Sequence, residues 1–189
     1  MTATDVARPS RSSVVDLVGG LLDAPLASWD TAAATPPAHA DTLGYRKALR
    51  EASERAGTDE SVVTGEGLIQ GRRIAVIANE FTFLAGSIGL ASATRIVEAV
   101  ERATAEQLPL VAIASSGGTR MQEGTMAFLA MPGIAAAVAE HKAAGLPYIA
   151  YLRHPTTGGV LASWGSLGTV KWSPAEWCTT DLSERVPPT

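Results

Sequence analysis

The feature that most constrains the fold is an internal echo in the second half of the chain. A Leu-Pro dipeptide leads into the apolar stretch Leu110–Ala114, which is followed by Gly117-Gly118 and a helical pattern. A second Leu-Pro leads into Tyr148–Leu152, which is followed by Gly158-Gly159 and another helical pattern. Repeated strand–helix units imply parallel strands joined by crossover connections. The chain is therefore predicted to be an α/β protein.

Four further elements are expected before this echo. A helix is predicted from Asp41 or Thr42 to about Ala56. Strands at 66–70 and 73–79 flank Gly71-Arg72, a plausible hairpin turn. Apolar residues with i, i+3, i+4, i+7 spacing then predict a helix that runs to about Ala103.

The 189 residues suffice for one domain with a substantial core. Residues 1–40 are irregular apart from a possible short helix at Val14–Leu22, and prolines 36 and 37 break any helix there. We therefore expect a mobile N-terminal tail or linker at 1–40 and the folded domain at 41–168.

Composition limits the function classes. A net charge of −4 gives no electrostatic reason to expect nucleic acid or an acidic membrane as a partner. No apolar run approaches the ~20 residues that span a bilayer. The single cysteine, Cys178, and three scattered histidines match no zinc-site spacing, so no metal site is expected. A cytoplasmic location is expected.

The two Gly-Gly turns are the candidates for chemistry. A helix start leaves about four backbone N–H groups without partners and carries a partial positive charge. Glycine in front of the helix lets a ligand oxygen approach those groups. Turns that end neighbouring parallel strands lie at one edge of the sheet, where α/β proteins bind ligands. The turns are predicted to hold an oxyanion; the alternative is that each is only a tight turn.

Four segments resemble signatures of biotin-dependent carboxyltransferases. Val63–Gly67 matches V-T-G-x-G, and Phe81–Gly89 is similar to F-T-F-x-G-G-S-[MI]-G. Ser115–Gly124 resembles S-G-G-[AT]-R-[MI]-Q-E-G, and Pro155–Ser163 resembles P-T-T-G-G-V-x-A-S. Their order is that of the N-terminal half of acetyl-CoA and propionyl-CoA carboxylase β-type subunits.

The resemblance implies a crotonase-like fold, a β-β-α superhelix shared with Clp proteases, here apparently incomplete at the C-terminus. It implies carboxyl transfer from carboxybiotin to an acyl-CoA, giving malonyl-CoA or methylmalonyl-CoA for fatty acid biosynthesis. Gly158 and Gly159 match the family's oxyanion pair for the thioester enolate, and Gly117 and Gly118 match the neighbouring turn. Substrate-binding roles are carried over to five residues: Gly86, Ser87, Thr119, Arg120 and Thr157.

The resemblance also implies partners. Carboxybiotin would come from a biotinylated carrier, charged by a biotin carboxylase subunit, and a C-terminal half in another chain would bind it within an oligomer. Five basic residues are candidates for the CoA phosphates, with solvated surface charge as the alternative for each: Arg72, Arg73, Arg120, Lys142 and Arg153.

Two departures leave alternatives open. The match stops at about Gly168, and 169–189 is predicted to be a divergent tail, so a non-catalytic acyl-CoA-binding fragment is one alternative. Pro132 is expected to kink or end the helix after the first Gly-Gly turn.

Because Gly159–Ser163 resembles the nucleophile segment of Clp proteases, a serine hydrolase that uses Ser163 is a second alternative. A decarboxylase that runs the enolate chemistry in reverse is a third.

Overall fold

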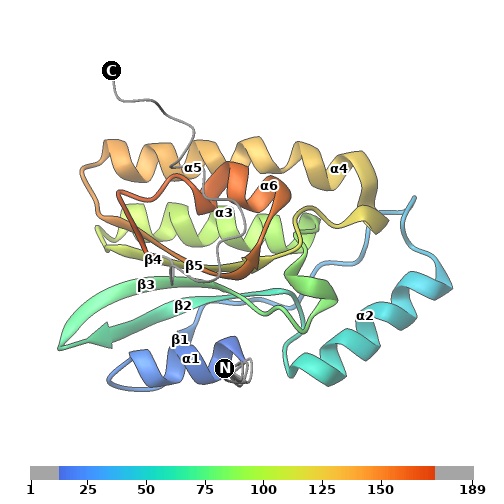
Figure 1. Cartoon of the computed structure of the whole chain (residues 1–189), viewed down its shortest axis with the longest axis horizontal. Helices are drawn as coiled ribbons and strands as arrows, with labels where there is room; N and C mark the ends of the chain where they lie inside the picture. The colour runs from blue at the N-terminus through green and yellow to red at the C-terminus, as the bar shows by residue number, and fades with distance from the viewer. Residues whose placement is uncertain (1–12, 173–189) are drawn as a thin grey trace, which may run out of the picture.

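A computed structural model describes residues 13–172 of the chain as a six-stranded sheet with helices on both faces (Figure 1). The strands lie side by side in sequence order: β1 (Ala27–Ser28), β2 (Val62–Ile69), β3 (Arg72–Asn79), β4 (Leu110–Ser116), β5 (Tyr148–Thr156) and β6 (Val170–Trp172). The first three strands pair antiparallel, and β3 to β6 run parallel. The predicted α/β class is confirmed.

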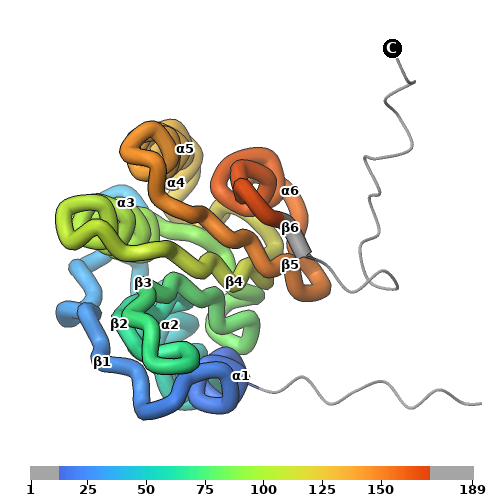
Figure 2. The backbone as a smooth tube through the Cα atoms, turned by 90° about the vertical axis from the view of Figure 1, so that its left-hand side faces the viewer, coloured from blue at the N-terminus to red at the C-terminus, as the bar shows by residue number. Residues whose placement is uncertain are grey.

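The helices form one layer on each face of the sheet. They are α1 (Val14–Leu21), α2 (Leu43–Ala56), α3 (Leu90–Ala105), α4 (Gly124–Leu129), α5 (Met131–Ala143) and α6 (Gly158–Val160). Figure 2 shows α3, α5 and α6 above the sheet and α1 below it. The larger core lies under α3 and α5 and includes Ile96, Leu110 and Ile134, all fully buried.

The crossover helix α3 forms where its apolar spacing predicts it. Ile96, Val100 and Ala103 follow one face and are buried against the sheet. At its start, the hydroxyl of Ser92 accepts a hydrogen bond from the Gly89 N–H at 2.9 Å, which occupies one of the free donors there. This anchors the N-terminus of α3 beside the loop that follows β3.

The hairpin between β2 and β3 differs by one residue from the prediction. Its turn residues are Gln70 and Gly71, both with positive φ (51° and 73°), and Ile69 pairs with Arg72. Two positive φ values define the turn type that best matches strand twist in two-residue hairpins. Gly71 correctly indicated a turn, but it occupies the second turn position rather than the first.

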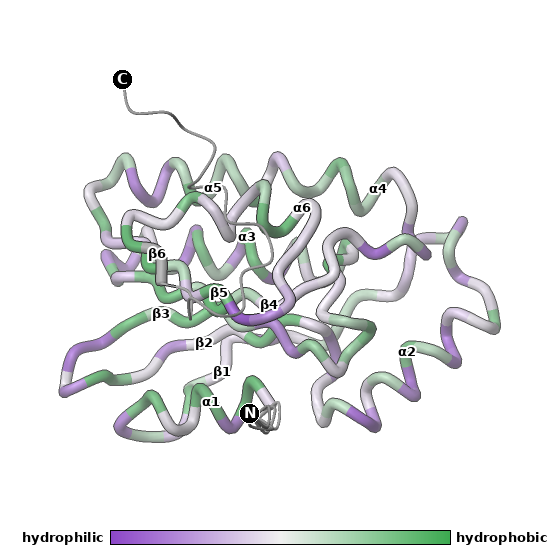
Figure 3. The backbone as a smooth tube through the Cα atoms, in the orientation of Figure 1, coloured by the Kyte–Doolittle hydropathy of each residue, from purple (hydrophilic) through white to green (hydrophobic). Residues whose placement is uncertain are grey.

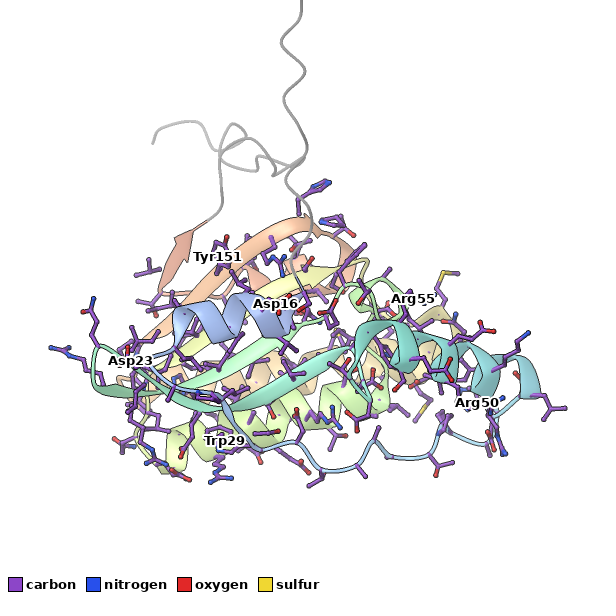
Figure 4. All side chains as sticks on the ribbon, turned by 90° about the horizontal axis from the view of Figure 1, so that it is seen from below. Asp16, Asp23, Trp29, Arg50, Arg55 and Tyr151 are labelled. Carbon is purple, nitrogen blue, oxygen red and sulfur yellow. The ribbon has the colours of Figure 1, made fainter. Side chains whose placement is uncertain are left out.

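Within the expected N-terminal tail, α1 packs on the sheet. Val14 and Val18 of α1 are buried in a second core against β3 and β4, and the Val14 N–H donates to Glu80 at 2.8 Å. Figure 4 views this face from below, with α1 (labelled at Asp16) across the strands and Tyr151 beside it. The i, i+4 valines bury enough apolar surface to hold the segment.

Pro132 separates two helices, as expected. Helix α4 ends at Leu129 and α5 begins at Met131, with Pro132 in the first turn of α5, where the missing N–H leaves no hydrogen bond unmade. Figure 3 shows hydrophobic colour along α4, which projects from the sheet layer, and several hydrophilic stretches on α2.

Beyond Gly168 the described chain still contributes to the sheet. Val170–Trp172 forms β6 and pairs with Ile149–Tyr151 of β5, so the expected divergent tail begins with a strand. Trp177 and Cys178 lie outside the described residues. Within 13–172, no helix is long and apolar enough to cross a membrane.

Candidate oxyanion site

The two Gly-Gly turns lie against each other at the carboxyl edge of the parallel strands. Ser116 pairs with Thr156, and the Thr157 N–H donates to the Ser116 carbonyl at 2.9 Å. A Cβ added to Gly118 would stand 3.6 Å from the Gly159 nitrogen and 3.7 Å from the Gly158 Cα. The echo in the sequence therefore brings the two glycine pairs to one place.

The amides of the first turn are already used within the protein. The Gly117 N–H donates to the Ala85 carbonyl at 2.9 Å, and the Gly118 N–H donates to the Ser116 hydroxyl at 3.0 Å. The first turn therefore does not supply donors to a ligand oxygen. This corrects the expectation that both turns share that task.

The amides of the second turn are placed differently. Gly158 and Gly159 are the first two residues of α6, positions whose N–H groups have no partner within a helix. Thr157 precedes them without a side-chain cap on these donors, and Gly158 is exposed. The pair therefore has two N–H groups that are not used within a helix and can be offered to a ligand oxygen.

Gly118 keeps the space in front of this pair open. Its φ of +110° is a conformation that favours glycine, and any side chain there would point at the Gly159 amide. The first turn therefore contributes shape rather than hydrogen bonds. Thr119 also lies at the site, because its methyl group stands 3.5 Å from the position of a Cβ on Gly159.

Arg120 does not have the geometry of a phosphate ligand. Its side chain is 1% exposed and forms a bidentate ion pair with the buried Glu60, one contact of which is 2.9 Å. Although burial opposes the charge, the hydrogen bonds and charge of Glu60 raise the pKa of Arg120 above its ordinary value. The expected substrate contact is therefore corrected: the guanidinium faces the protein interior.

A second carboxylate, Glu123, completes this buried cluster. It accepts the phenol hydrogen of Tyr45 at 2.5 Å and the N–H of Leu90, at the start of α3, at 2.6 Å. Burial raises the pKa of Tyr45, so its phenol stays protonated as a donor. The local sequence signalled Glu123, which lies three residues after Arg120 in the same motif. Nothing local pointed to Glu60 or Tyr45 as its partners.

Two other predicted contacts are also internal. Gly86 is buried and packs so closely that a Cβ would overlap the carbonyl oxygen of Ser115. The carbonyl of Ser87 accepts from Arg120 Nη2 and from the Ser61 hydroxyl, both at 2.8 Å. Gly86 and Ser87 therefore support the first turn from the protein interior. Thr157, in contrast, is exposed and remains at the site.

The basic candidates for the phosphates lie at two edges. Arg72 and Arg73 begin β3, and Lys142 lies in the last turn of α5, so they lie at the amino edge; Arg72 and Arg73 are about 30 Å from the turns at the usual rise per strand residue. Arg73 pairs there with Glu66 and Glu106. Arg153 of β5 lies near the carboxyl edge of the sheet, so it remains a candidate for a contact with the CoA phosphates.

The position of Ser163 argues against the hydrolase alternative. Its hydroxyl donates to the Gly159 carbonyl at 2.5 Å, inside the helical segment that follows the second turn, and the residue is 9% exposed. A nucleophilic serine needs an oxygen open to substrate and a base that takes its proton. The proton of Ser163 is instead committed to the helix.

The surface beside the turns is open and apolar. Four side chains on the segment 121–129 are exposed: Met121 (90%), Met126, Phe128 and Leu129. One groove of about 800 Å³ is lined mainly by α1 with residues 22–32, and another of about 560 Å³ is lined by residues 33–37, α2 and the cluster residues Glu60, Arg120 and Glu123; the glycine turns line neither. In the part of the chain that the structure covers, no three His, Cys, Asp or Glu side chains gather as metal ligands.

Comparisons with known proteins agree with this architecture. The chain is 63% identical over 141 residues to a probable biotin-dependent acyl-coenzyme A carboxylase beta3 subunit of Mycobacterium tuberculosis, covering 75% of this chain and 28% of the relative. It is 40% identical over 162 residues to the acetyl-coenzyme A carboxylase carboxyl transferase subunit beta of Agrobacterium fabrum, covering 86% and 54%. The chain thus spans about half or less of the length of these relatives.

The fold is shared with a solved carboxyltransferase. Transcarboxylase 12S superposes with a TM-score of 0.70 at 27% identity, over 86% of this chain and 29% of that one. This confirms the crotonase-like α/β fold that the four motifs implied. The family model described as the carboxyl transferase domain matches residues 39–174. The chain belongs to the carboxyl transferase domain family.

Proposed function

We propose that this chain is the acyl-CoA side of a carboxyltransferase subunit of a biotin-dependent acyl-CoA carboxylase. The observation that carries the proposal is the pair of N–H groups on Gly158 and Gly159 at the start of α6, beside Gly118, where a side chain would stand 3.6 Å from the Gly159 nitrogen. The relatives named above support the same reaction class.

The proposed chemistry is stabilisation of a thioester enolate. When the α-proton of an acyl-CoA leaves, the electron pair delocalises onto the thioester oxygen, and two fixed N–H donors stabilise that negative charge. Loss of one such donor typically costs roughly 3–4 kcal/mol of transition-state stabilisation. Cleavage of the N–C bond of carboxybiotin would supply CO₂, the biotin ring nitrogen would take the α-proton, and the enolate carbon would form its new bond to that CO₂, which yields malonyl-CoA or methylmalonyl-CoA.

The donor of the carboxyl group belongs to partners. Carboxybiotin on a biotinylated carrier supplies it, and we assign no residue of this chain to the biotin ring. The exposed apolar segment 121–129 follows directly after the first turn, so a second half docked there would enclose the thioester. Arg153, Thr119 and Thr157 are the proposed substrate contacts on this side.

The first experiment is a calorimetric titration of the folded protein with propionyl-CoA. We expect micromolar binding, weakened at least about tenfold by Gly158→Val, because a branched side chain at φ +58° displaces the donor pair. Circular-dichroism melts establish that both proteins fold. Absence of binding by a cooperatively folded wild type would contradict the proposal.

A turnover assay then separates the carboxyltransferase from the non-catalytic alternative. The chain is combined with biotin carboxylase, a biotinylated carrier and the C-terminal half of a relative. Carboxylation of propionyl-CoA in this mixture supports a working half-site. Binding without turnover would leave the chain as an acyl-CoA-binding domain alone.

A further inference from the structure

A buried cluster of charged side chains behind the first Gly-Gly turn has no part in the chemistry proposed above. Glu60, Arg120 and Glu123 are each at most 3% exposed, and all three are held by hydrogen bonds. Replacing a buried ion pair with apolar residues is often neutral for stability, so the pair by itself is weak evidence of a stabilising role. The hydrogen bonds between the cluster and the residues around the first turn indicate its role.

Arg120 joins the loop at 84–89 to the first turn. Its Nη2 donates to the Ser87 carbonyl at 2.8 Å, and its backbone N–H donates to the Ile88 carbonyl at 2.8 Å. The Ile88 N–H in turn donates to the Gly118 carbonyl at 2.9 Å. The loop is therefore fixed on both sides of Ile88 to the glycine that faces the proposed oxyanion pair.

Two glycines let the loop lie this close. A Cβ on Gly89 would overlap the Glu123 carboxylate and stand 2.9 Å from Arg120 Nη1. On the other side of the loop, a Cβ on Gly86 would overlap the Ser115 carbonyl. The loop is thus clamped between the charged cluster and the end of β4, with the Ala85 carbonyl accepting the Gly117 N–H.

We propose that Arg120 is a positioning residue for thioester recognition. Through Ser87 and Ile88 it sets the position of Gly118, and Gly118 sets the opening in front of the Gly159 N–H. The guanidinium does not touch the substrate. The inference rests on the proposed function, because it assigns a supporting residue to the same thioester site.

The test compares ligands with and without the thioester carbonyl. Propionyl-CoA and its thioether analogue S-propyl-CoA differ at the oxygen that the two N–H groups would bind. We expect the wild type to prefer the thioester by about tenfold, which is the upper end of the net value of one neutral hydrogen bond. Arg120→Lys keeps the charge but loses the bidentate fork, and we expect the preference to fall to about threefold or less.

Arg95→Lys is the matched control. Arg95 is also a buried arginine, paired with Asp59 at 2.7 Å and with the Val62 carbonyl at 3.0 Å, but its guanidinium joins α3 to the start of β2 and to Thr31 rather than to the loop at 84–89. The Arg95→Lys substitution should lower the melting temperature and leave the thioester preference unchanged. Tyr45→Phe removes one donor to Glu123 and should shift the preference in the same direction as Arg120→Lys, so it decides the question if that variant does not fold.

A third ligand excludes a direct phosphate contact. If Arg120 bound the CoA phosphates, Arg120→Lys would weaken both CoA ligands equally and leave S-propionyl-pantetheine, which lacks the nucleotide, unaffected. That pattern, or a folded variant with the full thioester preference, would overturn the proposal.

Amide hydrogen exchange tests the positioning without a ligand. Exchange at Ile88 and Gly117 should accelerate in Arg120→Lys and not in Arg95→Lys, whereas equal exchange in both variants would contradict the role of Arg120. Equal wild-type affinity for thioester and thioether would contradict the proposed function instead, and the exchange data would still decide the role of Arg120.

Discussion

Individual residues of the site differ in how far local sequence could identify them. Gly158 and Gly159 were identifiable because a glycine pair before a helix has a direct backbone consequence. Arg120 was misassigned because the sequence shows a positive charge beside the turn but not its partner: Glu60 lies 60 positions earlier. Long-range pairing of buried charges leaves no local signal.

The role of Gly118 gives a prediction at this scale. Gly118→Ala places a methyl group 3.6 Å from the Gly159 nitrogen at a φ of +110°. We expect at least about tenfold weaker propionyl-CoA binding and a loss of about 1–2 kcal/mol of stability from the backbone strain. Gly133→Ala is the control, because nothing lies within 4 Å of its Cβ position. Unchanged affinity in a folded Gly118→Ala would contradict the shape argument.

The buried His141 gives a pH prediction. Burial lowers the pKa of His141 below its ordinary value, and its Nδ1 lies 2.9 Å from the Thr104 hydroxyl. The unfolded chain therefore binds this proton more readily than the folded chain does. The contribution of His141 to the free energy of unfolding is fully present above about pH 6.5 and is lost as the pH falls below that value. The free energy of unfolding of His141→Gln should depend less on pH between 7 and 5, by at most about 1.4 kcal/mol per pH unit. Denaturant titrations with parallel pH profiles would exclude this contribution.

At the scale of elements, the sequence predicted the periodic segments well and the irregular ones poorly. The parallel strands and α3 follow apolar repeats that burial enforces. The helix α1 was expected, but its docking was not, because two valines within a polar segment do not show which surface they will meet. The same limit applies to β6, whose three residues pair only because β5 offers an open edge.

The docking of α1 is tested by neighbouring valines. Val18 is 2% exposed in the second core, whereas Val15 is 52% exposed on the same helix. Val18→Ala should reduce the free energy of unfolding by about 2 kcal/mol, and Val15→Ala should change it by less than about 0.5 kcal/mol. Urea denaturation measures both. Equal effects would mean that α1 does not pack on the sheet in solution.

At the scale of the whole molecule, the chain presents a site with one side open. Gly117 and Gly158 are exposed, Gly118 is buried, and segment 121–129, which follows the first turn, carries exposed apolar side chains. An exposed apolar patch of this kind is typical of a surface that another subunit covers. The chain also spans only about half or less of the length of these relatives.

This surface gives a prediction about association. In sedimentation velocity, the purified chain should associate increasingly with concentration, and the double variant Met126→Gln, Phe128→Gln should reduce that association. Leu43→Gln, at a still more exposed apolar residue on α2, is the control and should leave the association unchanged. Identical sedimentation of the double variant and the wild type would show that segment 121–129 is not an association surface.

The most direct test of the central claim is the infrared carbonyl band of bound propionyl-CoA labelled with ¹³C at the thioester carbon. Two N–H donors on one oxygen polarise the carbonyl bond, so the band should move to lower wavenumber on binding to the wild type. The displacement should be reduced in Gly158→Val at ligand saturation. A bound ligand whose carbonyl band stays at its position in water would contradict the assignment of Gly158 and Gly159 as the oxyanion pair.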